Sequence, residues 1–273
     1  MIEKIKPISV GDITISSCRN TIMAGPDAIE SENQTFTIAQ AVVGLGAQIL
    51  RGGAFKPRTS PESFQGHGIK ALRILFQAGR TFNVPVITEV MDPRQIPIIK
   101  KVSDGHPFIF QIGTRNAQNY SLLKSVGKTG IPVLLKRGKG SSVKEMLGAA
   151  KYVMNGGSPV IMCERGIETF SSASGTGRFT FDQMAIGVFH EHNFFCIADA
   201  NHAPGARQYV LPTGRAAIAF GADGLIVEVG LIGQDGKCHA LCDADQAISA
   251  DEFGLLVKQS RQIENIIKNS GKI

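Results

Sequence analysis

Ala47-Gln-Ile-Leu-Arg-Gly-Gly-Ala-Phe-Lys-Pro-Arg-Thr-Ser-Pro61 is an apolar run that changes abruptly into a cation-rich loop. Its Gly-Gly pair allows the backbone to turn sharply and to approach a ligand closely. Pro57 fixes one backbone dihedral between Lys56 and Arg58, which holds both side chains in a defined direction. Guanidinium, ammonium and hydroxyl groups on such a rigid loop suit the oxygens of phosphates and carboxylates. A solvated basic turn is the alternative, and it does not need this rigidity.

The same pattern, a short apolar run followed by polar residues, recurs along the chain. The strand candidates are 21–24, 47–50, 84–88, 108–112, 133–135, 159–162, 194–198 and 224–227. Segments with helical periodicity separate and follow them: 31–44, 64–82, 93–102, 117–128, 142–155, 181–191, 206–220 and 250–269. Strict alternation predicts a parallel sheet, and eight strands favour a closed (β/α)₈ TIM barrel in the α/β class over an open sheet.

The length of the chain fits one such domain. It has 273 residues, and a (β/α)₈ barrel needs about 250. Residues 4–16 alternate apolar and polar side chains around Gly11-Asp12, which predicts a short β-hairpin. We therefore expect a single domain over 1–273, with the hairpin in 1–18 and the barrel in 19–273. We find no region for a regulatory domain, and therefore expect no direct feedback by aromatic amino acids.

Composition argues against several classes of protein. No apolar run approaches the roughly 20 residues of a membrane span, and the first residues lack a signal-peptide core. The five cysteines show no metal or disulfide spacing, which favours reduced thiols and a cytoplasmic location. The net charge is +6, but there is no Lys/Arg run, no Trp and only three Tyr, so we expect no nucleic-acid partner. Small anionic substrates explain the positive balance better.

Charged or ligand-type residues follow nearly every strand candidate, and all strand ends of a barrel face one mouth, where active sites lie. Six cations should converge there: Arg51, Lys56, Arg58, Arg115, Lys136 and Arg165. Their mutual repulsion would destabilise the empty protein. A polyanion, or two anionic substrates bound together, would offset that repulsion. Each cation alone is as well explained by a surface salt bridge, but the six together are not.

These residues also carry a family resemblance. The Lys56–Ser60 segment resembles the Lys-Pro-Arg-Thr-Ser loop of short-chain 3-deoxy-D-arabino-heptulosonate 7-phosphate (DAHP) synthases. The resemblance covers nearly the whole chain, through Ala24-Gly25-Pro26, Thr88–Pro93, Gln111–Asn116, Leu135–Gly138 and Cys163–Gly166. It implies a transferase that condenses phosphoenolpyruvate with erythrose 4-phosphate, the first step of the shikimate pathway towards aromatic amino acids. It also implies a homo-oligomer, since family members are often tetramers or dimers.

The resemblance further implies a role for each cation. Those that would hold the phosphate of phosphoenolpyruvate are Arg115, Lys136 and Arg165, and those that would reach its carboxylate are Arg51 and Lys56. The phosphate of the aldose would bind to Arg58, Thr59 and Ser60. Glu89 would lie near the attacking water. We expect Lys56 to donate the proton to the aldehyde oxygen, with its pKa lowered by Arg51 and Arg58.

A divalent metal is also implied, bound in the family by Cys, His, Glu and Asp. Three positions match: His202, which we count among the catalytic residues, Glu228 and Asp243. The cysteine is replaced by Asp27. Three carboxylates this close need a compensating cation, either a metal or Lys56 together with trapped protons. Without the soft thiolate, we expect a harder and weaker site in which Mn²⁺ is favoured, or Mg²⁺.

Three alternatives stay open. A KDO 8-phosphate synthase would use arabinose 5-phosphate, but that sister family has Lys-Ala-Asn-Arg-Ser-Ser where this chain has Lys56-Pro-Arg-Thr-Ser60. A sibling synthase could use another phosphorylated aldose, since residues 171–178 differ from the usual family loop. A non-catalytic sugar-phosphate-binding barrel is the third, and only the change at Asp27 favours it.

Overall fold

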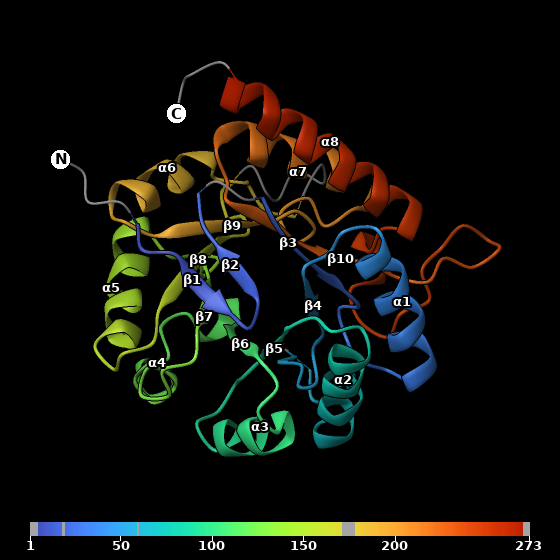
Figure 1. The fold of residues 1–273 in the computed structure, drawn as a ribbon, viewed down its shortest axis with the longest axis horizontal. Helices are drawn as coiled ribbons and strands as arrows, with labels where there is room; N and C mark the ends of the chain where they lie inside the picture. Colours follow the sequence, from blue (N-terminus) through green and yellow to red (C-terminus); the bar gives the residue numbers. More distant parts are fainter. Residues whose placement is uncertain (1–4, 18–19, 59, 171–177, 270–273) are drawn as a thin grey trace.

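The computed structural model describes residues 5–17, 20–58, 60–170 and 178–269, and it shows a closed barrel of parallel strands surrounded by helices (Figure 1). The strands of the barrel follow the chain in order, and the last pairs with the first. Their bounds are β3 Thr21–Gly25, β4 Ile49–Arg51, β5 Val86–Glu89, β6 Phe108–Ile112, β7 Val133–Lys136, β8 Val160–Glu164, β9 Phe195–Asp199 and β10 Gly224–Glu228. The predicted (β/α)₈ barrel is thus confirmed.

A helix follows each strand of the barrel. The helices are α1 Glu32–Gly44, α2 Ile69–Thr81, α3 Gln95–Ser103, α4 Tyr120–Gly127, α5 Val143–Met154, α6 Gln183–Glu191, α7 Val210–Phe220 and α8 Ala250–Asn269. Ser31 and Ser142 begin α1 and α5 as N-caps, and each side chain accepts a hydrogen bond from a first-turn backbone N–H. No helix in the described ranges is long and apolar enough to cross a membrane.

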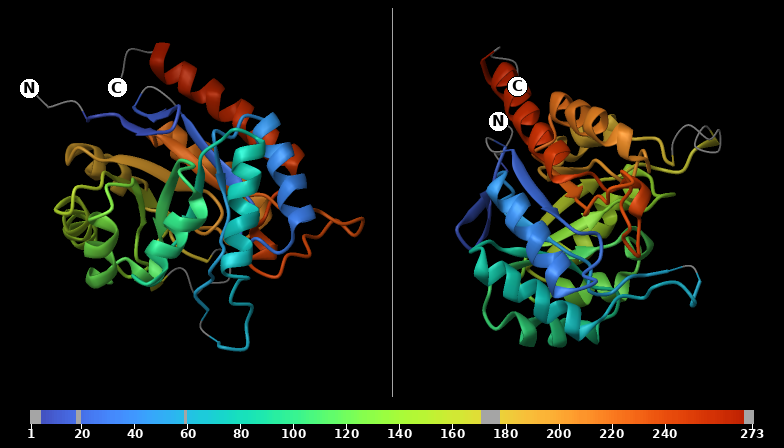
Figure 2. Two further views of the ribbon diagram at one scale, coloured as in Figure 1. Left: turned by 60° about the horizontal axis from the view of Figure 1, so that its bottom comes forward. Right: turned by 90° about the vertical axis from the view of Figure 1, so that its right-hand side faces the viewer.

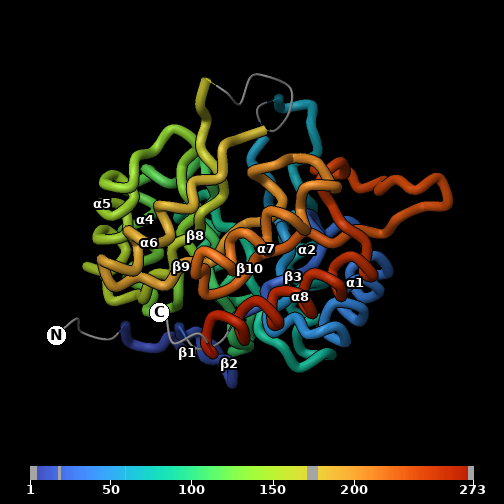
Figure 3. The backbone as a smooth tube through the Cα atoms, turned by 90° about the horizontal axis from the view of Figure 1, so that it is seen from above, coloured from blue at the N-terminus to red at the C-terminus, as the bar shows by residue number. Residues whose placement is uncertain are grey.

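A β-hairpin closes the end of the barrel that lies away from the loop after β4, as Figures 2 and 3 show. Its strands are β1 Ile8–Val10 and β2 Ile13–Ile15, paired antiparallel. Ile8, Val10 and Ile15 are buried against the inward-facing side chains of the barrel. The expected hairpin is therefore present, and it covers the end of the barrel interior opposite the loop after β4. The division of the chain at residue 18 stays a prediction.

Alternation along each strand divides the hydrophobic core into two layers, because successive side chains point to opposite faces. One layer fills the barrel and includes Met23, Ile87 and Ile109. The other lies between the barrel and its helices and includes Leu50 and Phe110. Packing on both faces makes the strands a rigid base for the side chains at their carboxyl ends.

The predicted bounds differ from the structure mainly at element ends. Helix α2 begins at Ile69 rather than 64, because the chain up to Gly68 belongs to the long loop after β4. Helix α7 begins at Val210, preceded by the 3₁₀ turn Arg207–Tyr209. Several strands also run one or two residues further than predicted and end on a charged residue. The predicted role of Thr59 concerns a position outside the described residues.

Candidate active site

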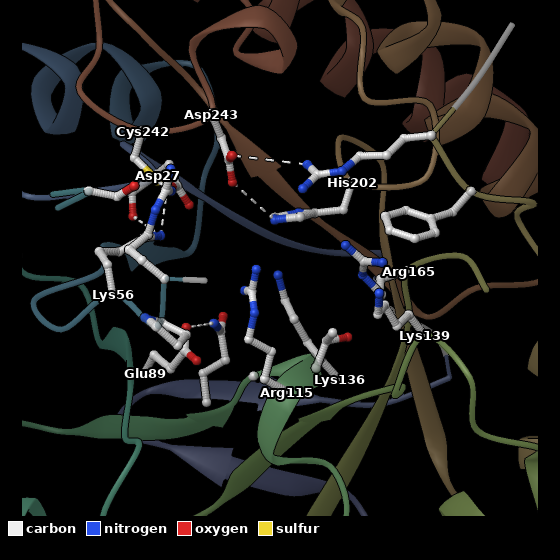
Figure 4. A pocket seen from close by; sticks show the side chains of 18 of the residues that line it. Asp27, Lys56, Glu89, Arg115, Lys136, Lys139, Arg165, His202, Cys242 and Asp243 are labelled. Carbon is white, nitrogen blue, oxygen red and sulfur yellow. Dashed lines mark hydrogen bonds and ion pairs between the residues drawn. The ribbon is translucent and has the colours of Figure 1, made fainter. Parts of the chain in front are cut away.

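A pocket of about 440 Å³ opens at the carboxyl ends of the strands (Figure 4). That volume is within the usual range for small-molecule sites, about 300–1,000 Å³. The residues that the sequence predicted and that line it are Asp27, Arg51, Lys56, Arg58, Ser60, Glu89, Arg115, Lys136, Arg165, His202 and Asp243. The structure thus brings the six expected cations to one cavity. It gives no test of their individual roles, which stay predictions.

The loop after β4 is held at both of its ends. The backbone N–H of Lys56 donates to the carbonyl of Gln65 (2.9 Å), and that of Gly68 donates to Ala54 (2.9 Å). Gly53 lets this loop approach the chain after β3 closely. A Cβ at Gly53 would lie 2.7 Å from the carbonyl oxygen of Asp27 and 2.8 Å from Cδ of Lys56. The missing side chain is what allows Lys56 to reach Asp27.

Asp27 lies between two cations, both buried. Its Oδ2 is 2.6 Å from Nζ of Lys56, and its Oδ1 is 3.1 Å from Nη2 of Arg51. Burial disfavours the charged carboxylate, but Lys56 and Arg51 more than offset this, so the pKa of Asp27 is well below its usual value. The residue that replaces the family cysteine is therefore an ionised acid in this environment.

The expected lowering of the Lys56 pKa is wrong. Burial, the largest single influence, lowers it, but Asp27, together with Cys242 and Glu89, raises the pKa of Lys56 above its usual value. The prediction considered only the neighbouring arginines and left out Asp27. Lys56 is therefore a stable ammonium group at neutral pH.

Mutual repulsion among the six cations is also smaller than expected, because several of them are paired with acids. Arg51 lies 2.9 Å from Oε1 of Glu228, and Lys136 lies 2.6 Å from Oδ2 of Asp199. Together with the Lys56–Asp27 pair, these contacts neutralise much of the inner half of the pocket. Arg165 differs, because it is buried while its Nε and Nη1 have no hydrogen-bond partner among the described residues.

Glu228 ends β10 and faces the same cluster. Burial raises its pKa to about 7, although His202 and Arg51 act in the opposite direction. Oε2 accepts a hydrogen bond from Gln246 at 2.5 Å. Oε1 is close to Nη1 of Arg51, but the two are not aligned as a hydrogen bond, and both atoms lack a hydrogen-bond partner. Oε1 therefore already faces one cation, Arg51, and a metal at this position would share the carboxylate with Arg51 or displace it.

His202 follows β9 and is oriented by Asp199, the last residue of that strand. Oδ2 of Asp199 lies 2.8 Å from Nδ1 of His202, and its Oδ1 accepts the backbone N–H of His202 at 3.1 Å. The other ring nitrogen, Nε2, lies 3.6 Å from Oδ2 of Asp243. Burial lowers the pKa of His202, but the negative charges of Asp199 and Glu228 outweigh burial, so the net shift of this pKa is upward. The ring thus turns Nε2 towards the acids across the pocket.

The predicted metal ligands come together. Asp27, His202, Glu228 and Asp243 each offer one atom, and these atoms lie within 4.8 Å of one another. Three carboxylate oxygens and one imidazole nitrogen form a donor set for a hard or borderline divalent cation. This donor set is compatible with the metal that the family implies. The ion pairs of Asp27 with Lys56 and Arg51, and of Glu228 with Arg51, would compete with that metal.

The other end of the pocket is built around Phe179. The guanidinium carbon of Arg165 lies 4.3 Å from the centre of the ring, and that of Arg178 lies 5.5 Å from it. Burial lowers the pKa of Arg165, and the positive charge of Arg178 adds to this. Two guanidinium groups at one aromatic ring favour binding of an anion between or beside them. Arg115 is exposed at the rim of this end.

Arg58 and Ser60 lie on the loop after β4, at a different part of the pocket wall. Nη1 of Arg58 lies 2.6 Å from Sγ of Cys242, which is buried next to Asp243. Burial raises the pKa of the Cys242 thiol, so it is a neutral neighbour of Arg58. Arg58 therefore lies against Cys242, whereas Arg165 lies against Phe179, and both line the same cavity.

Glu89 ends β5 and lies deep in the pocket. Burial is the main reason that its pKa is raised, and Lys56 and Lys136 only partly oppose the shift. Its Oε1 has no hydrogen-bond partner in the described structure. A weakly acidic carboxyl group with a free oxygen can bind a water molecule and accept a proton from it.

Sequence reasoning missed several residues of this site. Asp199 and Gln246 make the contacts described above, and Lys139, Arg178 and Phe179 line the pocket. Asp199 is one of the polar strand-end residues of the sequence and could have been assigned a role, because it ends β9 three residues before His202. Gln246 carries no comparable signal, since an isolated Gln in a loop has no pattern that marks it.

Comparisons with known proteins identify relatives over nearly the whole chain. The model of the DAHP synthetase I family matches residues 6–269. A phospho-2-dehydro-3-deoxyheptonate aldolase of Thermotoga maritima is 39% identical over 262 residues, which are 95% of this chain and 74% of that relative. The 2-dehydro-3-deoxyphosphooctonate aldolase of Geotalea daltonii is 28% identical, over 97% of this chain and 100% of the relative.

Solved structures agree with these relatives. The crystal structure of the DAHP synthase of Thermotoga maritima superposes with a TM-score of 0.86 at 37% identity, covering 98% of this chain and 75% of that one. A truncated form of 3-deoxy-D-arabino-heptulosonate 7-phosphate synthase from the same organism gives a TM-score of 0.85 at 34% identity, covering 97% of this chain and 94% of that one.

Proposed function

Since the chain belongs to the DAHP synthetase I family, we propose that the pocket at the barrel mouth condenses phosphoenolpyruvate with erythrose 4-phosphate. The family membership makes the chain a phosphoenolpyruvate-dependent synthase of the aldol type. The products are DAHP and inorganic phosphate, and one water molecule is consumed. The observation that carries the assignment to this pocket is its pattern of charge: Arg165 is buried with Nε and Nη1 unbonded among the described residues, and Arg58 lines the same cavity from the loop after β4.

Phosphoenolpyruvate binds, in this proposal, with its phosphate at Arg165, Lys136 and Arg115. Its carboxylate lies towards Arg51 and Lys56. The unpaired Nε and Nη1 atoms of Arg165 support this placement, since burying a cation without a partner is costly. A bidentate contact with phosphate oxygens would satisfy both atoms.

The aldose binds with its phosphate at Arg58, Ser60 and Thr59. Its aldehyde then lies between the two phosphates, near C3 of phosphoenolpyruvate. Holding two reactants in this way can supply about 7–11 kcal/mol of the rate enhancement. The bond between C3 and the aldehyde carbon forms, the aldehyde oxygen takes a proton, and positive charge develops at C2.

Water then adds to C2 and gives up its proton. Glu89 is suited to accept this proton, because its raised pKa and unpaired Oε1 make it a stronger base than an exposed carboxylate. The bond between C2 and the bridging oxygen breaks, and phosphate leaves. Arg165 and Lys136 stabilise the charge that develops on the departing group.

Lys56 is the proposed proton donor to the aldehyde oxygen. It is fully charged, because Asp27 raises its pKa. Such a group is a weak acid, so the donation depends on the negative charge that develops on the oxygen during C–C bond formation. Asp27 would then hold the neutral amine in place until it is protonated again.

A divalent metal fits Asp27, His202, Glu228 and Asp243, and it would supply Lewis-acid polarisation of the aldehyde oxygen when bound. We propose Mn²⁺ for this site, since the donors are three oxygens and one nitrogen. We also propose that the enzyme works in the cytoplasm as a homo-oligomer. The free thiols of Cys163 and Cys196 are consistent with a reducing compartment.

A second candidate reaction uses arabinose 5-phosphate, as the names of the more distant relatives indicate. Pro57, Arg58 and Thr59 disfavour it, because this loop resembles the one that binds erythrose 4-phosphate in the DAHP synthases. The distinction can be measured with purified protein, phosphoenolpyruvate and either aldose. Release of phosphate with erythrose 4-phosphate and little with arabinose 5-phosphate supports the proposal. The reverse preference would assign the second reaction, and no release with either would favour a non-catalytic barrel.

A further inference from the structure

Gln246 lies directly behind the candidate metal ligands, yet neither the sequence nor the family resemblance assigns it a role. It ends the 3₁₀ turn Ala244–Gln246, which follows Asp243. The side chain is buried, with the residue only 2% exposed. Its Nε2 donates to Oε2 of Glu228 at 2.5 Å, and its Oε1 accepts from Nη1 of Arg178 at 3.3 Å.

These two partners fix which way the amide of Gln246 points. If the amide were reversed, its carbonyl oxygen would face the acceptor oxygen of Glu228. Its NH₂ group would face the guanidinium of Arg178, which can only donate. Both contacts would be repulsive in a buried site, so Arg178 and Glu228 together select the observed orientation.

The backbone of Gln246 is fixed as well. Asn201 donates through Nδ2 to the carbonyls of Gln246 (2.7 Å) and Glu228 (3.2 Å). Its Oδ1 accepts the backbone N–H of Glu228 at 2.9 Å. Asn201 therefore joins the turn that carries Gln246 to the end of β10. The backbone of Gln246 cannot move away from β10 without breaking these hydrogen bonds.

The hydrogen bond from Gln246 decides what Glu228 can offer to the pocket. It uses Oε2 and leaves the buried Oε1 without a hydrogen bond among the described residues. Oε1 lies 2.9 Å from Nη1 of Arg51 and 3.5 Å from Nδ1 of His202, within the cluster that also holds Asp27 and Asp243, so a cation bound there would compete with Arg51 for this oxygen. Without Gln246, the ion pair with Arg51 would still attract the carboxylate, but nothing would hold Oε2, and Glu228 could rotate about that pair.

We propose that Gln246 is a positioning residue that holds the carboxylate of Glu228 with Oε1 turned towards a divalent cation between Asp27, His202 and Asp243. This inference rests on the proposed function, since it takes the metal site to be used in the reaction. Partners that orient a metal ligand typically change metal affinity or activity by about 10–100-fold when they are removed. Gln246 does not contact the residues assigned to phosphoenolpyruvate.

The test is the substitution Gln246→Met, which keeps the length of the side chain and removes both hydrogen-bonding groups. The dissociation constant for Mn²⁺, measured by equilibrium dialysis on chelator-treated protein without substrate, should rise about 10–100-fold. With saturating Mn²⁺, kcat should fall while KM for phosphoenolpyruvate stays within about twofold, because the binding end is untouched. Gln246→Asn, whose shorter amide cannot span the same distance, serves if the methionine variant does not fold.

Gln48→Met is the matched control. Oε1 of the half-buried Gln48 accepts the backbone N–H of Ile22 at 3.2 Å, near the start of β3 at the closed end of the barrel. This control loses a glutamine hydrogen bond as well, but it should keep the wild-type Mn²⁺ affinity and kcat. Wild-type Mn²⁺ affinity in Gln246→Met would overturn the inference while leaving the synthase function intact. Absence of both turnover and Mn²⁺ binding in the wild type would overturn the proposed function and this inference with it.

Discussion

Replacing Lys56 by methionine should abolish turnover and also destabilise the fold. Lys56 lies 2.6 Å from Oδ2 of Asp27, whose side chain is 3% exposed. The substitution removes the ammonium group and leaves a buried carboxylate with Arg51 as its remaining cation, at 3.1 Å. Stability and catalysis therefore depend on the same contact, and they can be separated by a second substitution.

The expected loss of stability follows from the burial of the pair. Removing one partner of a buried ion pair costs about 3–5 kcal/mol, and the second partner Arg51 places this site near the lower end, at about 3 kcal/mol. For a chain of this size, one kcal/mol shifts Tm by about 2–4 °C, so Lys56→Met should lower Tm by about 6 °C or more. Lys268→Met, on an exposed pair with Glu264, should cost less than about 1 kcal/mol.

The double variant Asp27→Asn with Lys56→Met separates the two effects. It removes the buried charge that Lys56→Met leaves uncompensated, so it should recover at least half of the lost Tm. Turnover, measured as phosphate release from phosphoenolpyruvate with erythrose 4-phosphate, should stay absent because the proton donor is still missing. Thermal unfolding of the wild type, Asp27→Asn, Lys56→Met and the double variant under one set of conditions gives the coupling between Asp27 and Lys56.

Two results would refute this reasoning. If Lys56→Met keeps a tenth of the wild-type turnover, Lys56 is not the proton donor. If the double variant is no more stable than Lys56→Met, the contact with Asp27 does not stabilise the fold, and the raised pKa of Lys56 has another origin.

Three further predictions concern the substrates and the metal. Arg58→Ala should raise KM for erythrose 4-phosphate more than KM for phosphoenolpyruvate, and equal increases in steady-state measurements would remove Arg58 from the aldose site. Burial raises the pKa of Glu228 to about 7, so protons compete with a cation for this carboxylate below that pH. Mn²⁺ affinity, measured by dialysis, should therefore rise about tenfold from pH 5 to pH 6 and level off above about pH 7. A flat pH profile would contradict this. Treatment with EDTA should stop turnover and Mn²⁺ should restore it; full activity after chelation, with no metal by elemental analysis, would show that Asp27 is not a ligand.

Hydrophobic periodicity was enough to predict the barrel, because each strand is buried on both faces and each helix on one. Strand ends were less predictable. Arg51, Lys136 and Glu228 were placed after their strands, but the strands include them. These charged side chains find partners at the mouth, so the backbone pairing continues through them. A rule based on local polarity cannot anticipate a partner that lies far away in the sequence.

The same reason limits what the sequence said about the site. It placed Lys56 among cations, and the structure places it against Asp27, which reverses the direction of its pKa shift. The spacing of strand ends predicted that Asp27, His202, Glu228 and Asp243 would meet, since barrel topology alone brings them to one mouth. Gln246 could not be predicted, because its role depends on side-chain contacts that topology does not determine.

The fate of the bridging oxygen of phosphoenolpyruvate tests the proposed chemistry most directly. Phosphoenolpyruvate labelled with ¹⁸O in the C2–O–P bridge is incubated with the protein and erythrose 4-phosphate, and the released phosphate is examined by mass spectrometry. Attack by C3, addition of water at C2 and cleavage of the C2–O bond predict that phosphate is released only when the aldose is present, and that it carries the label. Unlabelled phosphate, or release of phosphate without the aldose, would contradict the account.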